Sequence, residues 1–155
     1  MTRAVVLTAA LLPLALIAGG GAAEPIVGVW KLDHQELNGQ SKEIEPLTLR
    51  ISPDGDKFLF AFAVPVNHID FVSMSYSAKL DGTEADVNNS QRIKVGTVQI
   101  TRAKPSQYKF VLKGGNGRES SGRLTVSPDG KTLTSESDSN QSGQPLHLLQ
   151  SFLRR

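Results

Sequence analysis

The chain has 155 residues, with 17 Lys and Arg against 15 Asp and Glu, no cysteine and a formal net charge of +2. A charge balance this close to neutral excludes the strongly basic surface that binding to nucleic acid requires. Without cysteine the protein can form no disulfide, no thiolate nucleophile and no thiolate metal site.

Residues 1–23 have the pattern of a secretory signal peptide. A basic residue precedes the apolar run 4–18 (AVVLTAALLPLALIA), which is short for a membrane span and is interrupted by Pro13. We expect cleavage after Ala23, which leaves residues 24–155 as one domain; an uncleaved anchor is the alternative. The predicted location is the periplasm or the outside of the cell, without a lipid-modified N-terminus and without stable membrane insertion after cleavage.

The segment after the leader is predicted to form strands. The first strand contains Gly28 and Trp30, and the polar stretch 34–45 (HQELNGQSKEIE) after it is predicted to be an open loop or one helical turn. Residues 57–64 (KFLFAFAV) are apolar on both sides, which predicts a strand that is covered on both faces or turns one face toward a ligand or partner. Residues 71–80 (FVSMSYSAKL) alternate apolar and polar side chains, which is typical of a half-buried antiparallel strand.

Turn sequences separate these runs. SPDG occurs at residues 52–55 and 127–130, each time between apolar-alternating runs, and predicts two hairpins. Further turn sequences lie at 80–83, 103–107, 114–117 and 139–145. Together they predict an all-β, antiparallel up-and-down meander of eight to ten strands. Such a meander removes its exposed edges by closing into a barrel; a two-sheet β-sandwich is the competing arrangement.

Gly28-Val29-Trp30 in the first strand resembles the opening of lipocalins and their calycin-type relatives. The layout from GVWKL through SPDGKTL to the last strand also resembles uncharacterised bacterial secreted proteins with a lipocalin-like domain. The resemblance implies a closed lipocalin-like barrel in which Trp30 closes one end and an arginine near the end of the last strand stacks on it. Arg154 is the favoured partner because it shares its parity with the more apolar face of that strand. The alternative is that Arg154 and Arg155 form a frayed, solvated terminus.

The sequence departs from the family pattern in ways that bear on cofactors. The Thr-Asp-Tyr element of typical lipocalins is absent, and no helix follows the last predicted strand. Streptavidin-like barrels line their site with several tryptophans, but this chain has one, which disfavours biotin. Haem-binding barrels of the nitrobindin type carry more glycines after Gly-x-Trp, which disfavours haem. No cofactor is predicted.

Catalytic and metal motifs are missing. His34, His68 and His147 are the three histidines, and their spacing matches no metal motif, so they are interpreted as loop or surface residues. No Gly-x-Ser-x-Gly elbow occurs, and the serines of residues 120–142 are assigned to hairpins. The glycine-rich stretch 113–120 precedes a predicted strand rather than a helix, which excludes a phosphate cradle. The sequence therefore favours a protein without catalytic activity.

Two rows of apolar side chains on adjacent predicted strands are candidates for the wall of a ligand site. The candidate ligand-binding residues are Phe60, Phe62, Met74, Tyr76 and Phe110. They predict an exported binding protein for a small apolar or amphipathic molecule. The first alternative is a filled barrel that binds another envelope protein through residues 34–45 and 65–70. The second is a barrel enzyme of the cyclase or isomerase type, which would need Tyr76 or a histidine directed into the cavity.

Overall fold

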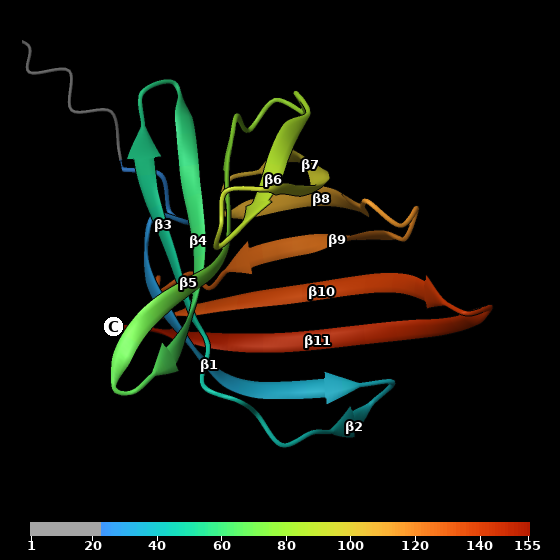
Figure 1. Ribbon diagram of the computed structural model, residues 1–155. Helices are drawn as coiled ribbons and strands as arrows, with labels where there is room; N and C mark the ends of the chain where they lie inside the picture. The colour runs from blue at the N-terminus through green and yellow to red at the C-terminus, as the bar shows by residue number, and fades with distance from the viewer. Residues whose placement is uncertain (1–22) are drawn as a thin grey trace, which may run out of the picture.

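The computed structural model describes residues 23–155, and every regular element in this part of the chain is a β-strand (Figure 1). The strands are β1 (Gly28–Leu37), β2 (Gln40–Ser41), β3 (Thr48–Asp54), β4 (Lys57–Val66), β5 (Ile69–Ala78), β6 (Ala85–Asn89), β7 (Lys94–Lys104), β8 (Gln107–Gly114), β9 (Glu119–Val126), β10 (Thr132–Gln141) and β11 (Gln144–Arg154). The predicted signal peptide lies almost entirely outside the described residues. Among the described residues, no helix is long and apolar enough to cross a membrane.

Ten antiparallel strands follow one another around a closed barrel, and β2 is an additional short strand paired with β1. The barrel closes where β11 pairs with β1, from Trp30 opposite Arg154 to Leu37 opposite Leu148. Closure hydrogen-bonds the two strands that would otherwise be the exposed edges of the meander. The predicted closed up-and-down barrel is confirmed, and the alternative of a two-sheet sandwich is wrong.

The predicted hairpin turns lie where the strands reverse. Gly55 and Gly130 end the two SPDG sequences with φ values of 64° and 70°, a left-handed conformation that glycine adopts without strain. In the second turn, Asp129 accepts hydrogen bonds from the hydroxyl of Ser127 at 2.6 Å and from the amide of Lys131 at 3.0 Å. These side-chain bonds fix the β9–β10 connection at the end of the barrel where the chain terminates.

The prediction for residues 34–45 was wrong over half of its length. β1 continues through these polar residues to Leu37, because the backbone of β11 pairs with it there. The chain then turns at Asn38 and Gly39, which have φ values of 50° and 75°, and returns as β2. Backbone pairing holds this extension, together with the hydrogen bond from Gln150 to Gln35, so it needs no apolar face. The remaining residues 42–47 form an irregular loop.

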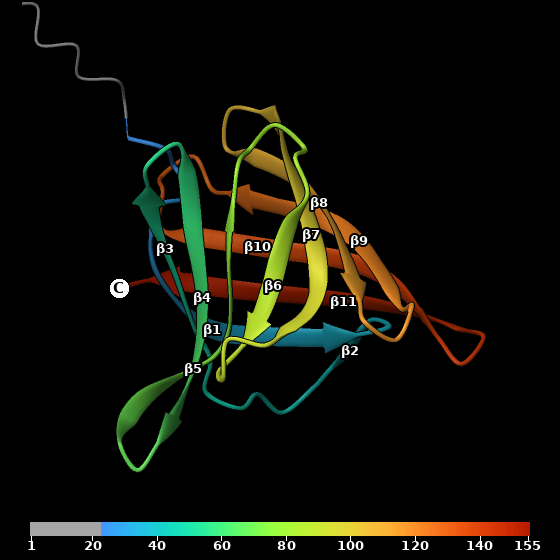
Figure 2. The same cartoon turned by 45° about the horizontal axis from the view of Figure 1, so that its top comes forward.

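β4 and β5 form a hairpin that projects beyond its neighbours (Figure 2). β3 pairs with β4 only as far as Ala63, and β6 pairs with β5 only at Met74 and Ser75. A bulge after Phe62 shifts the register between β4 and β5. Of the two alternatives for residues 57–64, the structure agrees with a strand that turns one face inward: Phe60 and Phe62 face the barrel interior, Leu59 on the other face is half-exposed, and the outer part of the hairpin is exposed.

The core occupies the end of the barrel where the first described residues lie. The largest fully buried side chains include Trp30, Tyr108, Phe60 and Phe152. Ile26, which precedes β1, is also fully buried among them. We call this the closed end; the opposite end carries the loop 42–47.

Candidate functional site

Trp30 and Arg154 form the closed end of the barrel. The guanidinium carbon of Arg154 lies 4.2 Å from the centroid of the Trp30 ring system. The indole Nε1 donates a hydrogen bond to the carbonyl of Ile26 at 2.9 Å. A guanidinium over an indole is attracted to the negative face of the ring, which contributes about 0.5–2 kcal/mol depending on exposure. The structure thus brings together two of the three residues predicted to close the barrel.

Arg154 is held by more than the indole. Its guanidinium donates to three carbonyls, those of Gly130 at 2.6 Å, Val27 at 2.8 Å and Pro25 at 2.8 Å. Three donors of one planar group reach two segments, the β9–β10 turn and the residues just before β1, a geometry that lysine cannot reproduce. Arg154 is therefore held by the indole and by three backbone carbonyls, an arrangement that we call the arginine clamp, and it is not part of a frayed terminus.

Gly28 provides the space for the arginine clamp. A Cβ atom on Gly28 would lie 2.5 Å from Nη1 of Arg154 and 3.7 Å from Nε1 of Trp30. A side chain there would displace the guanidinium from its carbonyl acceptors. The structural reason for the Gly-x-Trp pattern in this chain is thus room for the arginine.

A partly open cavity of about 210 Å³ lies in the interior of the barrel. Its lining comes from strands around the whole barrel: Leu49, Phe60, Phe62, Met74, Tyr76, Val98, Phe110, Leu112, Ser120, Leu124, Ser135, Ser137, Leu148, Gln150 and Phe152. All five candidate ligand-binding residues are among them. The barrel is therefore not completely filled by its own side chains.

Aromatic side chains from β4 and β5 form one wall of this cavity. The rings of Phe60 and Tyr76 stack with centroids 4.9 Å apart, and the ring of Phe62 lies 6.0 Å from that of Tyr76 in a tilted arrangement. Phe60 pairs with Tyr76 across the strands, and Phe62 pairs with Met74, so alternation directs all four side chains inward. Burial raises the pKa of Tyr76 well above its usual value, so its hydroxyl stays protonated and uncharged.

The opposite wall carries polar groups that sequence analysis missed. Ser120, Ser135, Ser137 and Gln150 line the cavity from β9, β10 and β11. From the sequence, the serines of residues 120–142 are assigned to hairpins, and none of them is predicted to line a binding site. The signal was present in LTSESDS, residues 133–139, where serines alternate with carboxylates. In this strand the serines face inward and the carboxylates face outward.

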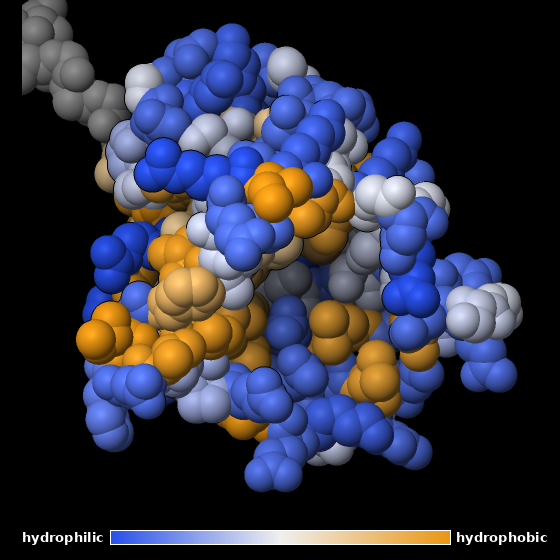
Figure 3. All heavy atoms as spheres, viewed as in Figure 1, coloured by the Kyte–Doolittle hydropathy of each residue, from blue (hydrophilic) through white to orange (hydrophobic). Residues whose placement is uncertain are grey.

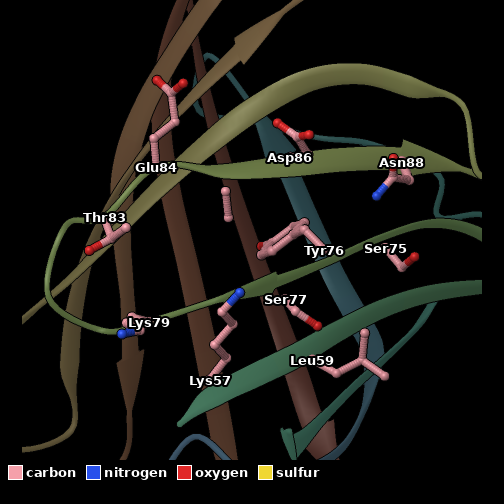
Figure 4. Close-up of a pocket in the computed structure, with 11 residues that line it drawn as sticks. Lys57, Leu59, Ser75, Tyr76, Ser77, Lys79, Thr83, Glu84, Asp86 and Asn88 are labelled. Carbon is pink, nitrogen blue, oxygen red and sulfur yellow. The ribbon is translucent and has the colours of Figure 1, made fainter. Parts of the chain in front are cut away.

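A second hollow, of about 490 Å³, lies on the outer surface where β5 and β6 diverge (Figure 4). Most of its lining is polar or charged, including Lys57, Lys79, Glu84 and Asp86. Tyr76 lines both this outer groove and the inner cavity. Tyr76 therefore lies between the two spaces.

The three histidines lie apart from the cavity lining. His34 is within 2.9 Å of Glu36 on β1, His68 is in the β4–β5 turn, and His147 is on β11. Within residues 23–155, no three His, Asp or Glu side chains are grouped so that they could hold a metal ion. The hypothesis that they are surface residues agrees with these positions.

His147 is flanked by carboxylates on the outside of the barrel. Its Nδ1 lies 2.7 Å from Asp138 Oδ1, and its Nε2 lies 3.5 Å from Glu136 Oε1. The hydrogen bond with Asp138, together with the negative charges of Asp138 and Glu136, raises the pKa of His147 above 6.5. Because this pKa is raised in the folded state, the interaction of protonated His147 with Asp138 and Glu136 stabilises the fold, and this stabilisation is fully present below pH 6.5. It is lost as the pH rises through the folded-state pKa.

We expect Asp138→Asn to lower the pKa of His147, because the hydrogen bond to an anion becomes one to a neutral amide. An NMR titration of the His147 ring protons measures this shift. Asp56→Asn is the control, since Asp56 pairs with Lys79 on another hairpin and should leave the titration unchanged. An unchanged pKa in Asp138→Asn would show that Asp138 does not set it.

The β4–β5 hairpin exposes large apolar side chains in and next to the predicted contact segment 65–70. Val66, Ile69, Phe71 and Val72 are 42–71% exposed. Figure 3 shows hydrophobic residues gathered over this hairpin. The interaction of this segment with a partner protein stays a prediction.

One solved structure with a similar fold is that of zebrafish ileal bile acid-binding protein complexed with cholic acid. It superposes with a TM-score of 0.54 at 16% sequence identity, over 84% of this chain and 99% of that chain. At this identity the similarity shows the fold alone, which is a closed antiparallel β-barrel. No family model matches the sequence, and no curated protein matches it. The resemblance to bacterial secreted lipocalin-like proteins thus stays a prediction.

Proposed function

We propose that the protein is an exported, non-catalytic binding protein that holds one small lipophilic molecule inside its barrel. The observation that carries this proposal is the interior cavity with its aromatic wall. Binding sites for small molecules are typically concave and apolar, with a few placed polar groups, and this cavity has that composition. The bile acid complex of the structural neighbour supports the proposal, since it shows a barrel of this fold bound to a small molecule.

The size of the cavity limits the ligand. An apolar cavity of about 150 Å³ in another protein binds benzene. At about 210 Å³, the cavity here suits a molecule built on a single ring or a short aliphatic chain. A larger ligand would require the walls to move, and Tyr76, at the divergence of β5 and β6, is placed to do so.

Two features support the exported and non-catalytic parts of the proposal. Glu24 would become the first residue after cleavage, and its carboxylate contacts Arg102 and accepts a hydrogen bond from Tyr108. Removal of residues 1–23 would leave these contacts intact, as expected of an exported lipocalin-like protein. Within the part of the chain that the structure describes, the cavity lining contains no histidine and no carboxylate, the side chains that most often move protons in catalysis.

We expect Ser135→Leu to abolish ligand binding while the barrel stays folded. The leucine would fill the cavity from the polar wall with apolar volume, which competes directly with the ligand. Native mass spectrometry of protein purified without detergent after expression of the full chain measures the bound molecule as a mass excess that disappears on denaturation. NMR titration with toluene measures the capacity of the cavity independently.

Ser139→Leu is the matched control. Ser139 lies on the same strand with the same parity as Ser135, but it lines a different hollow, near Asn116 and Arg118. It should therefore retain the bound molecule and the toluene-induced shifts. A wild-type protein that has the bare mass and shows no toluene binding would contradict the proposed function.

A further inference from the structure

We propose, on the premise of the binding function above, that the cavity selects uncharged molecules that join an apolar body to one hydroxyl or carbonyl group, and that it discriminates against carboxylates. Two independent observations carry this inference. One is the arrangement of the polar groups in the lining. The other is the position of the charged side chains that neighbour these groups; Arg154, which shares the parity of Gln150 on β11, lies at the closed end against Trp30.

The polar groups are concentrated on one side of the cavity. Ser135 and Gln150 lie directly opposite each other on β10 and β11, and Ser137 follows two residues later on the same face of β10. Gln150 donates a hydrogen bond from Nε2 to Gln35 Oε1 at 2.9 Å, which holds its amide in place. Directly opposed side chains in a sheet have Cβ atoms about 4.5–5.5 Å apart, so one ligand hydroxyl can bond to both.

The aromatic wall faces these groups from β4 and β5. A ligand between the two walls would place its apolar part against Phe60, Phe62 and Tyr76 and its polar group against Ser135 and Gln150. Such a ligand satisfies the hydroxyls that line the cavity. A hydrocarbon of the same shape offers these hydroxyls no hydrogen-bond partner, which disfavours its binding. The geometry therefore favours an amphipathic molecule over a hydrocarbon.

Among residues 23–155, no charged side chain lines the cavity. The charged residues of β9, β10 and β11 that neighbour the polar wall have the opposite parity and pair outside the barrel. Arg123 lies 3.9 Å from Glu136, which in turn lies 3.5 Å from His147. Lys109 and Lys113 on β8 have the outward parity of their strand, opposite to that of Phe110 and Leu112.

A carboxylate in this cavity would therefore have no cation beside it. An unpaired buried charge is costly, and serine hydroxyls compensate for it only in part. The Tyr76 hydroxyl is protonated and adds no positive charge. A neutral hydroxyl or carbonyl group bears no such cost, so charge is the property by which the cavity separates otherwise similar ligands.

The test compares three probes with the same ring: toluene, benzyl alcohol and benzoate. Each is titrated at pH 7.5 into ¹⁵N-labelled protein made from the full chain, and dissociation constants are taken from amide shifts of cavity residues. We expect benzyl alcohol to bind at least tenfold more tightly than benzoate. In Ser135→Ala/Ser137→Ala, benzyl alcohol should lose about five- to tenfold in affinity, whereas toluene should bind as well as before.

Ser139→Ala is the matched control, because it removes a hydroxyl of the same strand and parity outside the cavity lining. It should leave all three affinities unchanged. Benzoate binding as tightly as benzyl alcohol, or equal losses of toluene and benzyl alcohol in the double variant, would overturn this inference while leaving the binding function standing. Failure of all three probes to bind would instead contradict the proposed function, and with it this inference.

Discussion

Trp30→Ala is expected to lower the free energy of unfolding by about 3–5 kcal/mol, the usual cost of removing a buried tryptophan. The side chain is fully buried, and its Nε1 is hydrogen-bonded to the backbone at Ile26. Its loss also removes the surface on which the guanidinium of Arg154 stacks. The effect is large because a single side chain joins the segment before β1, the first strand and the last strand.

Urea unfolding followed by far-ultraviolet circular dichroism measures this change, since the variant lacks the tryptophan that fluorescence would report. Leu153→Ala is the control, because Leu153 neighbours Arg154 but is 46% exposed and should cost less than about 1 kcal/mol. Arg154→Lys should also destabilise the protein, since an ammonium group cannot reach three carbonyls at once. A loss below 1 kcal/mol in Trp30→Ala would show that the closed end does not anchor the barrel.

Gly122→Ala is expected to weaken both the barrel and its cavity. A Cβ atom at Gly122 would overlap the carbonyl oxygen of Glu136 and lie 2.8 Å from both Cζ of Phe110 and Cα of Ser137. Two of these atoms belong to the backbone of β10, which cannot move without breaking its pairing with β9 or β11. Overpacking of this kind typically costs about 1–3 kcal/mol.

The same substitution should reduce the affinity for benzyl alcohol more than tenfold. Phe110 forms part of the aromatic lining and Ser137 part of the polar wall, so displacing either changes the shape of the cavity. Gly115→Ala is the control: the nearest atom to its Cβ is the carbonyl oxygen of Val95 at 3.3 Å, outside the cavity lining. Unchanged stability in Gly122→Ala would show that β9 and β10 separate easily, and unchanged affinity would place the ligand away from Phe110.

The aromatic half of the candidate site could be predicted from the sequence because Met74 and Tyr76 lie on a strongly alternating strand next to the apolar run 57–64. Met74 and Tyr76 alternate with serines, so their shared face follows from the period of two. Their position opposite Phe62 and Phe60 follows from a short connection between two adjacent strands. The partnership of Trp30 with Arg154 was predictable only through the resemblance, because the two residues lie at opposite ends of the described chain.

The polar half of the site could not be predicted in the same way. In β10 both faces are mostly hydrophilic, with Ser135 and Ser137 on one side and Glu136 and Asp138 on the other. Leu133, on the same face as the serines, is the one apolar residue of this strand, so hydrophobicity gives only a weak indication of which face is internal. The extension of β1 to Leu37 is another case, because it depends on backbone pairing with β11 and not on an apolar pattern.

By itself, the sequence determined the all-β class, the order of the strands and the positions of the hairpins, because alternation and turn residues act over a few neighbouring residues. Only the tertiary structure decided that the meander closes, that Gly28 makes room for a guanidinium and that a cavity of about 210 Å³ remains inside. These features depend on how far apart residues of distant strands lie once the sheet is curved. That distance is set by the packing of the whole barrel and not by any one segment.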